Sequence, residues 1–302
     1  MRSTSTSCGS SSPERVTSLA LSLVLFSALV HATWNFLLKK SGGGAGLVTA
    51  ASATSVVLYI PVVAAAVWIQ GYAFQPFHLV LMLGSGVIHM AYFLLLDRAY
   101  RSGGDLSIVY PLARATGPLL TIVIAVSALG ERPGPTALVG AVLVVGSALV
   151  LTGNPFSGRR GSGRAMALAL LTGCTIAGYT VWDKASVHTW SVPPLVYEWG
   201  CNVFRMAVLL PWSAAHAPGG MARAWRERRK TVLAIALLSP LAYLLVLIAM
   251  VFTPVSLVAP TREVSILFAA LMGAHLLREG DLTRRAIAAV GMALGVAGLA
   301  LG

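Results

Sequence analysis

The sequence predicts an all-α integral membrane protein whose ten transmembrane helices form two inverted five-helix repeats. Three observations lead to this fold class. Of the 302 residues, 57% are hydrophobic and only 11% are charged, and the mean hydropathy is +0.80, whereas a soluble domain usually carries about 25% charged residues. The apolar residues fall into runs long enough to span a bilayer, and polar motifs of the first half recur in the second half.

The apolar runs define ten predicted helices, each long enough to cross roughly 30 Å of hydrocarbon with some tilt. These segments are Leu19–Leu38, Leu47–Ile69, Phe77–Leu96, Leu106–Ala128, Thr136–Thr152, Ala165–Trp182, Pro194–Ala214, Thr231–Phe252, Val255–Leu277 and Ala286–Leu301. They leave little room for a soluble domain. The chain therefore divides into a polar N-terminal tail (1–18), a first five-helix repeat (19–153), a linker (154–164) and a second five-helix repeat (165–302).

The first predicted helix has a second interpretation as a signal peptide. Arg15, the apolar run behind it and the small residues around Ala32 resemble a signal sequence with its cleavage site. We favour a retained helix, because the apolar run continues through Trp34 to Leu38 and because a similar segment recurs in the second half.

An internal repeat supports the division into halves. The matching pairs, first half and then second half, are Trp34 and Tyr179, Lys39 and Lys184, Tyr92 and Tyr243, Arg114 and Arg262, Glu131 and Glu279, and Gly140 and Gly291. The paired positions keep their order and lie 145 to 151 residues apart, and 17 positions separate the arginine from the glutamate in both halves. Because five is an odd number, the second copy starts on the opposite side of the membrane. Such inverted repeats let a central site face each side in turn.

Three stretches of the first half, HATWNFLLKK, GGDLSIVYPLARATGPLL and LGERP, have weaker echoes in the second half, namely YTVWDK, VAPTREV and LLREGD. With these motifs the chain resembles the EamA family of the drug/metabolite transporter superfamily. The resemblance covers about Leu19 to Leu301. It implies ten helices around a central cavity and an activity in the export or import of small metabolites, amino acids or drugs.

One face of the first predicted helix is unusually polar. His31, Asn35 and Lys39 lie at i, i+4 and i+8 and therefore share this face, with Trp34 beside them. A charge at the bilayer centre costs about 2.5–3.5 kcal/mol, so deep polar groups persist where they face a cavity or a partner. We predict one wall of a substrate cavity here, although a hydrogen bond between helices is an alternative for His31. Lys40 is expected to anchor the helix at the water boundary.

Arg114 and Arg262 occupy matching positions behind Pro111 and Pro260. Proline removes a backbone donor, and the carbonyl group that it frees can line a cavity. We predict that these arginines bind an anionic group of the substrate, such as a carboxylate or a phosphate. The alternative is an ion pair with a glutamate such as Glu263, which would only lock helices together.

The seventh predicted helix carries Glu198, Asn202 and Arg205 at i, i+4 and i+7, again on one face. This stripe can pair with itself, or Glu198 and Glu263 can serve as proton carriers if transport is coupled to protons. The whole predicted substrate-binding set is His31, Trp34, Asn35, Lys39, Tyr92, Tyr110, Arg114, Tyr179, Lys184, Asn202, Tyr243 and Arg262.

Other functional classes find little support. The sequence has no zinc-protease, P-loop or nucleophile-elbow motif, so we predict no catalytic residues. Its three cysteines lack metal-ligand spacing, so we predict neither a metal nor another cofactor. The formal charge of +12 does not indicate nucleic-acid binding, because the basic residues sit in short gaps between apolar runs.

We therefore expect a secondary transporter rather than an enzyme, moving an amino acid, an organic anion or a drug-like compound by alternating access. A membrane-embedded enzyme or flippase acting on a lipid-linked substrate, and a membrane scaffold or sensor, stay open as alternatives. The expected partners are a small-molecule substrate and the lipid bilayer. Whether the chain forms a homodimer is left open by the sequence.

The predicted location is the plasma membrane, with several passes through it. Four Lys or Arg residues fall on the side of the two termini and fifteen on the other side. The positive-inside rule then places both termini outside. Proteins that the chain resembles are usually drawn with both termini in the cytoplasm, so the two arguments conflict.

Overall fold

The computed structural model describes residues 17–102, 106–152, 163–277 and 282–302. These residues form helices and connecting loops and contain no β-strand. The helices are α1 (Ser18–Lys40), α2 (Ala45–Gln70), α3 (Pro76–Arg101), α4 (Leu106–Ala128), α5 (Pro135–Thr152), α6 (Gly163–Lys184), the π-helix η1 (Ala185–Thr189), α7 (Pro194–His216), α8 (Gly220–Phe252), α9 (Val255–Thr261), α10 (Val264–Leu277) and α11 (Leu282–Leu301).

Each of the ten predicted segments contains helix, and two segments depart most from the prediction. The ninth segment is broken into α9 and α10, because Pro260 cannot donate to the helical ladder and the chain tightens into i→i+3 bonds at Arg262 and Glu263. Helix α8 begins at Gly220 rather than Thr231, because a polar helical turn precedes its apolar part; the backbone leaves helical geometry at Arg228, between the two. Among the described residues, seven helices are long and apolar enough to cross a membrane.

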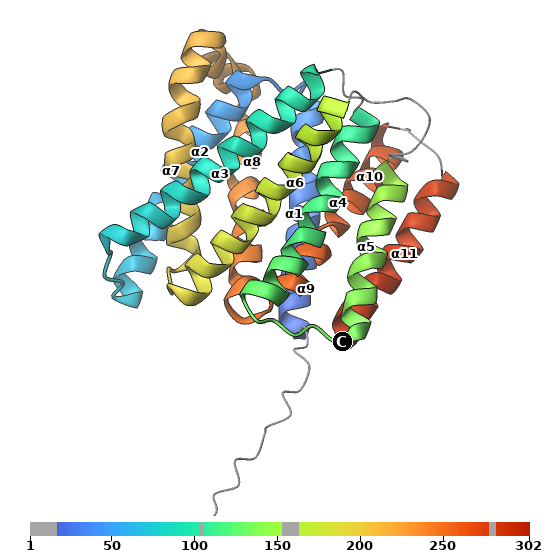
Figure 1. Cartoon of the computed structure of the whole chain (residues 1–302). Helices are drawn as coiled ribbons and strands as arrows, with labels where there is room; N and C mark the ends of the chain where they lie inside the picture. The colour runs from blue at the N-terminus through green and yellow to red at the C-terminus, as the bar shows by residue number, and fades with distance from the viewer. Residues whose placement is uncertain (1–16, 103–105, 153–162, 278–281) are drawn as a thin grey trace, which may run out of the picture.

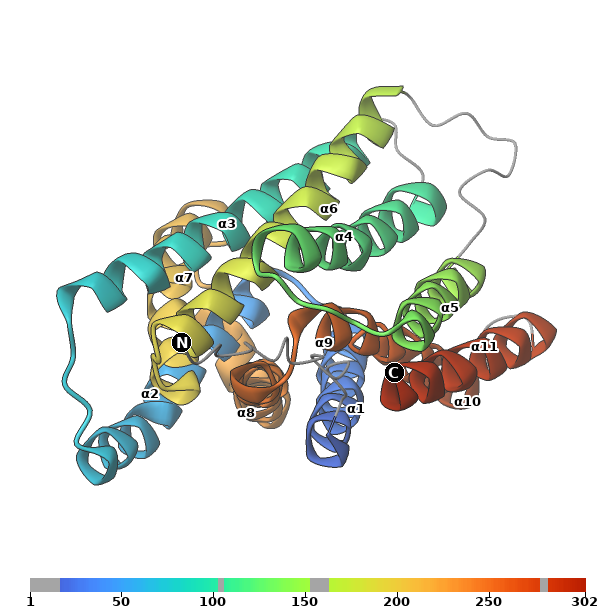
Figure 2. The same ribbon diagram turned by 60° about the horizontal axis from the view of Figure 1, so that its bottom comes forward.

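The helices run up and down between two ends of the molecule (Figure 1). We call the end with the first turn of α1 and the C-terminus the termini end. We call the opposite end the basic end, because it carries the last turns of α1 and α3 and the arginine-rich start of α8. Helix α1 packs against α8 and α10. Helix α6 packs against α3 and α4, as the turned view in Figure 2 shows.

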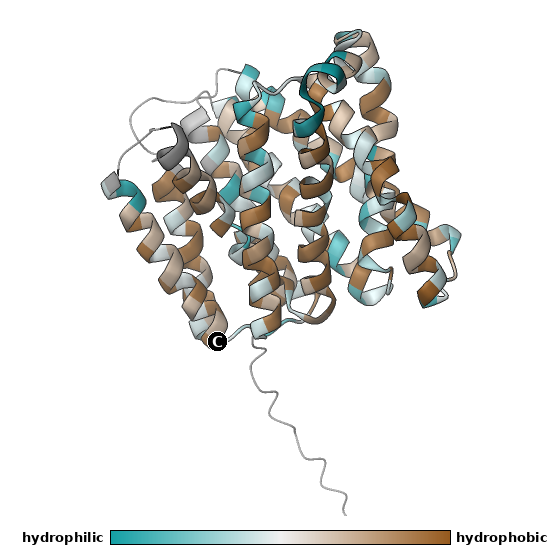
Figure 3. Cartoon of the chain, turned by 180° about the vertical axis from the view of Figure 1, so that it is seen from behind, coloured by the Kyte–Doolittle hydropathy of each residue, from teal (hydrophilic) through white to brown (hydrophobic). Residues whose placement is uncertain are grey.

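The outer surface of the bundle is apolar, as expected for a protein surrounded by lipid. Large hydrophobic side chains such as Val57, Val62 and Leu294 are 66%, 52% and 60% exposed. Figure 3 shows brown, hydrophobic residues along the outward faces and teal, hydrophilic residues gathered toward the basic end. The helices therefore bury polar groups inside and present hydrocarbon outside.

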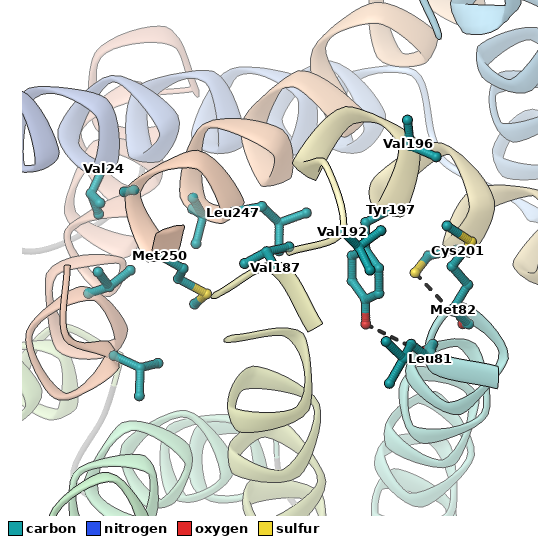
Figure 4. Close-up of a cluster of buried hydrophobic side chains, with 14 of the residues drawn as sticks. Val24, Leu81, Met82, Val187, Val192, Val196, Tyr197, Cys201, Leu247 and Met250 are labelled. Carbon is teal, nitrogen blue, oxygen red and sulfur yellow. Dashed lines mark hydrogen bonds between the residues drawn. The ribbon is translucent and has the colours of Figure 1, made fainter. Parts of the chain in front are cut away.

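A buried apolar cluster fills the termini end (Figure 4). It joins the first turns of α3 and α7 to the last turns of α8 and to η1, and we call it the termini-side core. Its members include Val24, Leu81, Met82, Val187, Val192, Val196, Tyr197, Cys201, Leu247 and Met250. Because these ten side chains are at most 5% exposed, this core separates the interior of the bundle from the termini end.

Helices α5 and α11 make the most extensive helix–helix contact among the described elements. Gly140 permits this approach, since a Cβ atom at that position would lie 2.5 Å from the Gly295 carbonyl oxygen. Small residues at such a contact are the usual way for membrane helices to pack closely.

Candidate substrate-binding cavity

A cavity of about 430 Å³ lies inside the bundle. Its walls come from α1, α2, α3, α4, α6, α7 and α8 and from the break between α9 and α10. Leu38 in the last turn of α1 and Val48 in the first turn of α2 line it, so it reaches toward the basic end. Toward the termini end the lining stops at Ser27 in α1 and Val246 in α8, where the termini-side core begins.

The structure brings ten of the twelve predicted binding residues to this cavity. They are His31, Trp34, Asn35, Tyr92, Tyr110, Arg114, Tyr179, Asn202, Tyr243 and Arg262. The predicted proton carrier Glu198 lines it as well, together with His89 and Arg205.

Two predicted residues lie elsewhere. Lys39 is exposed in the last turn of α1 and does not line the cavity, because it lies beyond Leu38 at the helix end. Lys184 is buried at the other end of the molecule, and its ammonium group donates to the carbonyl oxygens of Met250 (2.7 Å) and Thr253 (3.1 Å). These are carbonyl groups at the C-terminus of α8, so Lys184 caps that helix.

The α1 wall combines an aromatic pair with an unsatisfied donor. The rings of His31 and Trp34 meet edge to face, with centroids 5.1 Å apart. The Asn35 amide donates to the His31 carbonyl oxygen of its own helix at 2.8 Å. The indole nitrogen of Trp34 is buried and has no hydrogen-bond partner among the described residues. An unpaired buried donor beside a cavity is a natural contact for a ligand.

A second wall is a cluster of rings from α3, α6 and α8. His89 stacks on Tyr179, with centroids 4.0 Å apart and planes inclined by 22°. Tyr243 meets His89 edge to face at 5.9 Å, and Tyr92 meets Tyr179 in the same way at 6.3 Å. This arrangement gives the cavity flat aromatic faces beside its charged groups.

Both predicted proton carriers are in ion pairs. The Arg114 guanidinium lies 3.1 Å from a Glu263 carboxylate oxygen, and their side chains are only 16% and 6% exposed. Arg205 lies 2.9 Å from Glu198, which also accepts a 2.7 Å hydrogen bond from Asn202. The stripe on α7 therefore does pair with itself, and Arg114 joins α4 to the α9–α10 break.

Arg262 differs from the other two arginines of the cavity. Its guanidinium lies over the Tyr243 ring, 5.1 Å from the centroid. Within the described part of the chain no carboxylate lies within 4.0 Å of it. A cation held on an aromatic face keeps its N–H donors for another partner. Arg262 is therefore the arginine best placed to take an anionic group in the cavity.

Asp183 is a polar residue of the interior that the sequence analysis missed. It is fully buried in α6, one turn beyond Tyr179 on the same face. One carboxylate oxygen accepts a 2.6 Å hydrogen bond from the Tyr197 hydroxyl, and the other accepts one from the Tyr243 hydroxyl. The i, i+4 spacing from Tyr179 is the signal that could have found it.

The termini end is also held by a polar contact between the predicted halves. The Glu131 carboxylate accepts hydrogen bonds from the backbone N–H groups of Val255 (2.7 Å) and Ser256 (2.9 Å). These groups begin α9, where the helix dipole favours negative charge. Its predicted counterpart Glu279 lies outside the described residues.

The interior shows no metal-binding cluster among the described residues, since no three His, Cys, Asp or Glu side chains gather there. The polar groups that do converge are arginines, amides, phenols and imidazoles. Such groups bind small polar molecules by hydrogen bonding, charge and stacking.

Comparison with known proteins supports the fold alone. No family model matches the chain, and no curated protein matches it. By contrast, 28 chains of solved structures do match. One of them, described only as "Crystal structure of protein", has a TM-score of 0.72 and 19% sequence identity, over 93% of this chain and 97% of that chain. The same arrangement of helices therefore spans nearly the whole of both molecules.

Proposed function

We propose that the protein is a secondary transporter of the plasma membrane that moves a small anionic metabolite by alternating access. The observation that carries this proposal is the cavity, where Arg262 lines a space surrounded by apolar helices. Its volume of about 430 Å³ lies in the range of roughly 300–1,000 Å³ that small-molecule sites usually have.

Helix packing supports ten transmembrane helices arranged as two inverted repeats. A two-fold relation would exchange α1 with α6, α2 with α7, α3 with α8, α4 with α9 and α10, and α5 with α11. The contact of α1 with α8 should then recur between α6 and α3, and that of α4 with α6 between α10 and α1. Both contacts are present, and the pairs α5–α11 and α2–α7 join counterparts directly.

The unequal ends of the cavity support alternating access. Its walls reach the basic end, whereas the termini-side core, Glu131 and Lys184 close the other end. By rocking one half against the other, an inverted pair of repeats can close the end that is open and open the end that is closed. The conformation described is then one of the two states that such a cycle requires.

Aromatic faces and an arginine with no carboxylate within 4.0 Å among the described residues together indicate the substrate class. Tyr92, Tyr179 and Tyr243 can stack on a flat or apolar part of the substrate. Arg262 can bind a carboxylate or phosphate, and the Trp34 indole N–H can donate to a second acceptor. We expect an organic anion or an amino acid whose charged group faces Arg262.

Binding and transport test the proposal together. Purified protein is screened for thermal stabilisation by amino acids and by mono- and dicarboxylates, and the labelled hits are followed into proteoliposomes. Arg262→Ala should weaken binding roughly tenfold to a hundredfold, since a hydrogen bond to a charged group contributes about 1.5–3 kcal/mol. Arg101→Ala, which removes an exposed arginine paired with Asp97, is the matched control. Equal binding by both variants would contradict the role of Arg262.

A further inference from the structure

Asp183 is a buried carboxylate that does not line the cavity, so substrate binding alone does not account for it. It is 0% exposed, and its two oxygens accept hydrogen bonds from two phenols, Tyr197 of α7 and Tyr243 of α8. Within the described residues no Lys, Arg or His lies within 4.0 Å of it. The neighbouring Lys184 directs its ammonium group to carbonyl groups of α8 and of the turn after it.

The two glutamates near the cavity are in a different situation. Glu198 and Glu263 each lie about one hydrogen-bond length from an arginine, at 2.9 Å and 3.1 Å. Taking up a proton would break a buried ion pair and leave the arginine without its partner, which is costly. Asp183 can take up a proton without breaking an ion pair. Of these three acids, Asp183 is the one suited to gain and lose a proton during a cycle.

Charged and titratable groups lie on every element packed around this part of α6. They are Tyr179 and Lys184 of α6, His89 of α3, Tyr197, Glu198, Cys201 and Arg205 of α7, Tyr243 of α8, Arg114 of α4, His188 of η1 and Arg262 beyond α9. Arg205 and Arg114 are engaged by Glu198 and Glu263, and Arg262 lies over Tyr243. Each of these three arginines thus already has a partner, and Asp183 is not one of these partners.

Asp183 also connects the cavity with the closed end. Tyr243 lines the cavity, and its hydroxyl group reaches Asp183. Tyr197 belongs to the termini-side core, and its hydroxyl reaches the other oxygen of the same carboxylate. A change at Asp183 therefore acts on both the binding wall and the packing that closes the termini end.

From this placement we propose that Asp183 is the proton-binding residue that couples a proton to the transport cycle. The inference rests on the proposed transport function and assigns its energy source. A hydronium ion in the cavity gives a proton to the Tyr243 oxygen while the Tyr243 hydroxyl proton passes along the existing hydrogen bond to Asp183, giving a carboxylic acid and water. That hydrogen bond then reverses: the acid donates to the Tyr243 oxygen, and the tyrosine proton turns toward the cavity as a donor for the anion. The Tyr197 hydroxyl keeps its bond to the other oxygen until the termini end opens and the proton leaves there.

The test follows the acid group itself and needs no substrate. Full-length protein in lipid nanodiscs is titrated from about pH 9 to about pH 4, a range that brackets carboxyl groups, while infrared difference spectra record the C=O stretch of protonated carboxylic acids. We expect one buried acid band in the wild type that is lost in Asp183→Asn, an isosteric change, and retained in Asp97→Asn, which alters an exposed acid. Tyr243→Phe should keep this band but shift it, because one hydrogen-bond partner is gone.

Two outcomes would overturn the assignment: no such band in the wild type, or an unchanged band in Asp183→Asn. If Asp183→Asn does not fold, the frequency shift in Tyr243→Phe decides instead, and an unshifted band counts against Asp183. Because the readout is spectroscopic, it separates the two proposals. A transported anion with no Asp183 band would refute only the coupling site, whereas an Asp183 band without binding or transport of any anion would refute only the proposed function.

Discussion

Replacing Glu131 with alanine should destabilise the protein by about 3–5 kcal/mol. The buried carboxylate accepts two hydrogen bonds, at 2.7 Å and 2.9 Å, from the first N–H groups of α9. A hydrogen bond to a charged group contributes about 1.5–3 kcal/mol, and the substitution leaves two donors of a helix N-terminus unsatisfied. Glu131→Gln keeps one acceptor oxygen in place, so it should cost about half as much.

Unfolding by sodium dodecyl sulphate in mixed micelles, followed by circular dichroism, measures these differences. Asp97→Ala is the control, since it removes a carboxylate of similar chemistry from an ion pair that is 54% exposed on its acidic side. An exposed pair contributes less than about 1 kcal/mol. If Glu131→Ala cost no more than Asp97→Ala, the contact with α9 would not hold the termini end, and the reasoning would fail.

Two further stability predictions use the same assay. Arg114→Ala should cost about 3–5 kcal/mol because it leaves Glu263 buried without its arginine, and Arg114→Met combined with Glu263→Gln should recover much of that loss; a double variant no more stable than Arg114→Ala would show that the ion pair is not the cause. Gly140→Ala should cost about 1–3 kcal/mol, since its Cβ would meet the backbone of α11. Gly146→Ala in the same helix, where a Cβ meets nothing within 4 Å, should be neutral or stabilising by up to about 1 kcal/mol, and equal effects at the two glycines would contradict the close packing of α5 and α11.

Hydrophobic length predicted the helices well, because a bilayer demands about 20 apolar residues per helix. The same criterion missed the first turns of α8, since the stretch before Thr231 is helical without being apolar. The ninth segment was predicted as one helix, and its break after Thr261 lies just beyond Pro260, which has no N–H for the helical ladder.

The polar face of α1 was predictable because helical periodicity alone places His31 and Asn35 together. Partners across helices were not, because spacing within one helix does not say which side chain of another helix it meets. The sequence left open whether Arg114 binds an anion or a glutamate, and the structure pairs it with Glu263. Likewise, the repeat singled out Lys184 as the counterpart of Lys39. Adjacent residues on a helix point about 100° apart, so the neighbouring Asp183 faces a different direction and was not selected.

Alternating access is the central claim, and the exposure of the cavity to each side of the membrane tests it directly. In a variant without native cysteines, Ser239→Cys places a thiol on the cavity wall, and Leu237→Cys, on the same helix and 48% exposed on the outer apolar surface, is the control. A membrane-impermeant maleimide is applied to right-side-out and to inside-out vesicles. We predict that Ser239→Cys reacts in both preparations and Leu237→Cys in neither. Reaction of Ser239→Cys from one side only would contradict alternating access, because the cavity would then be accessible from a single side of the membrane.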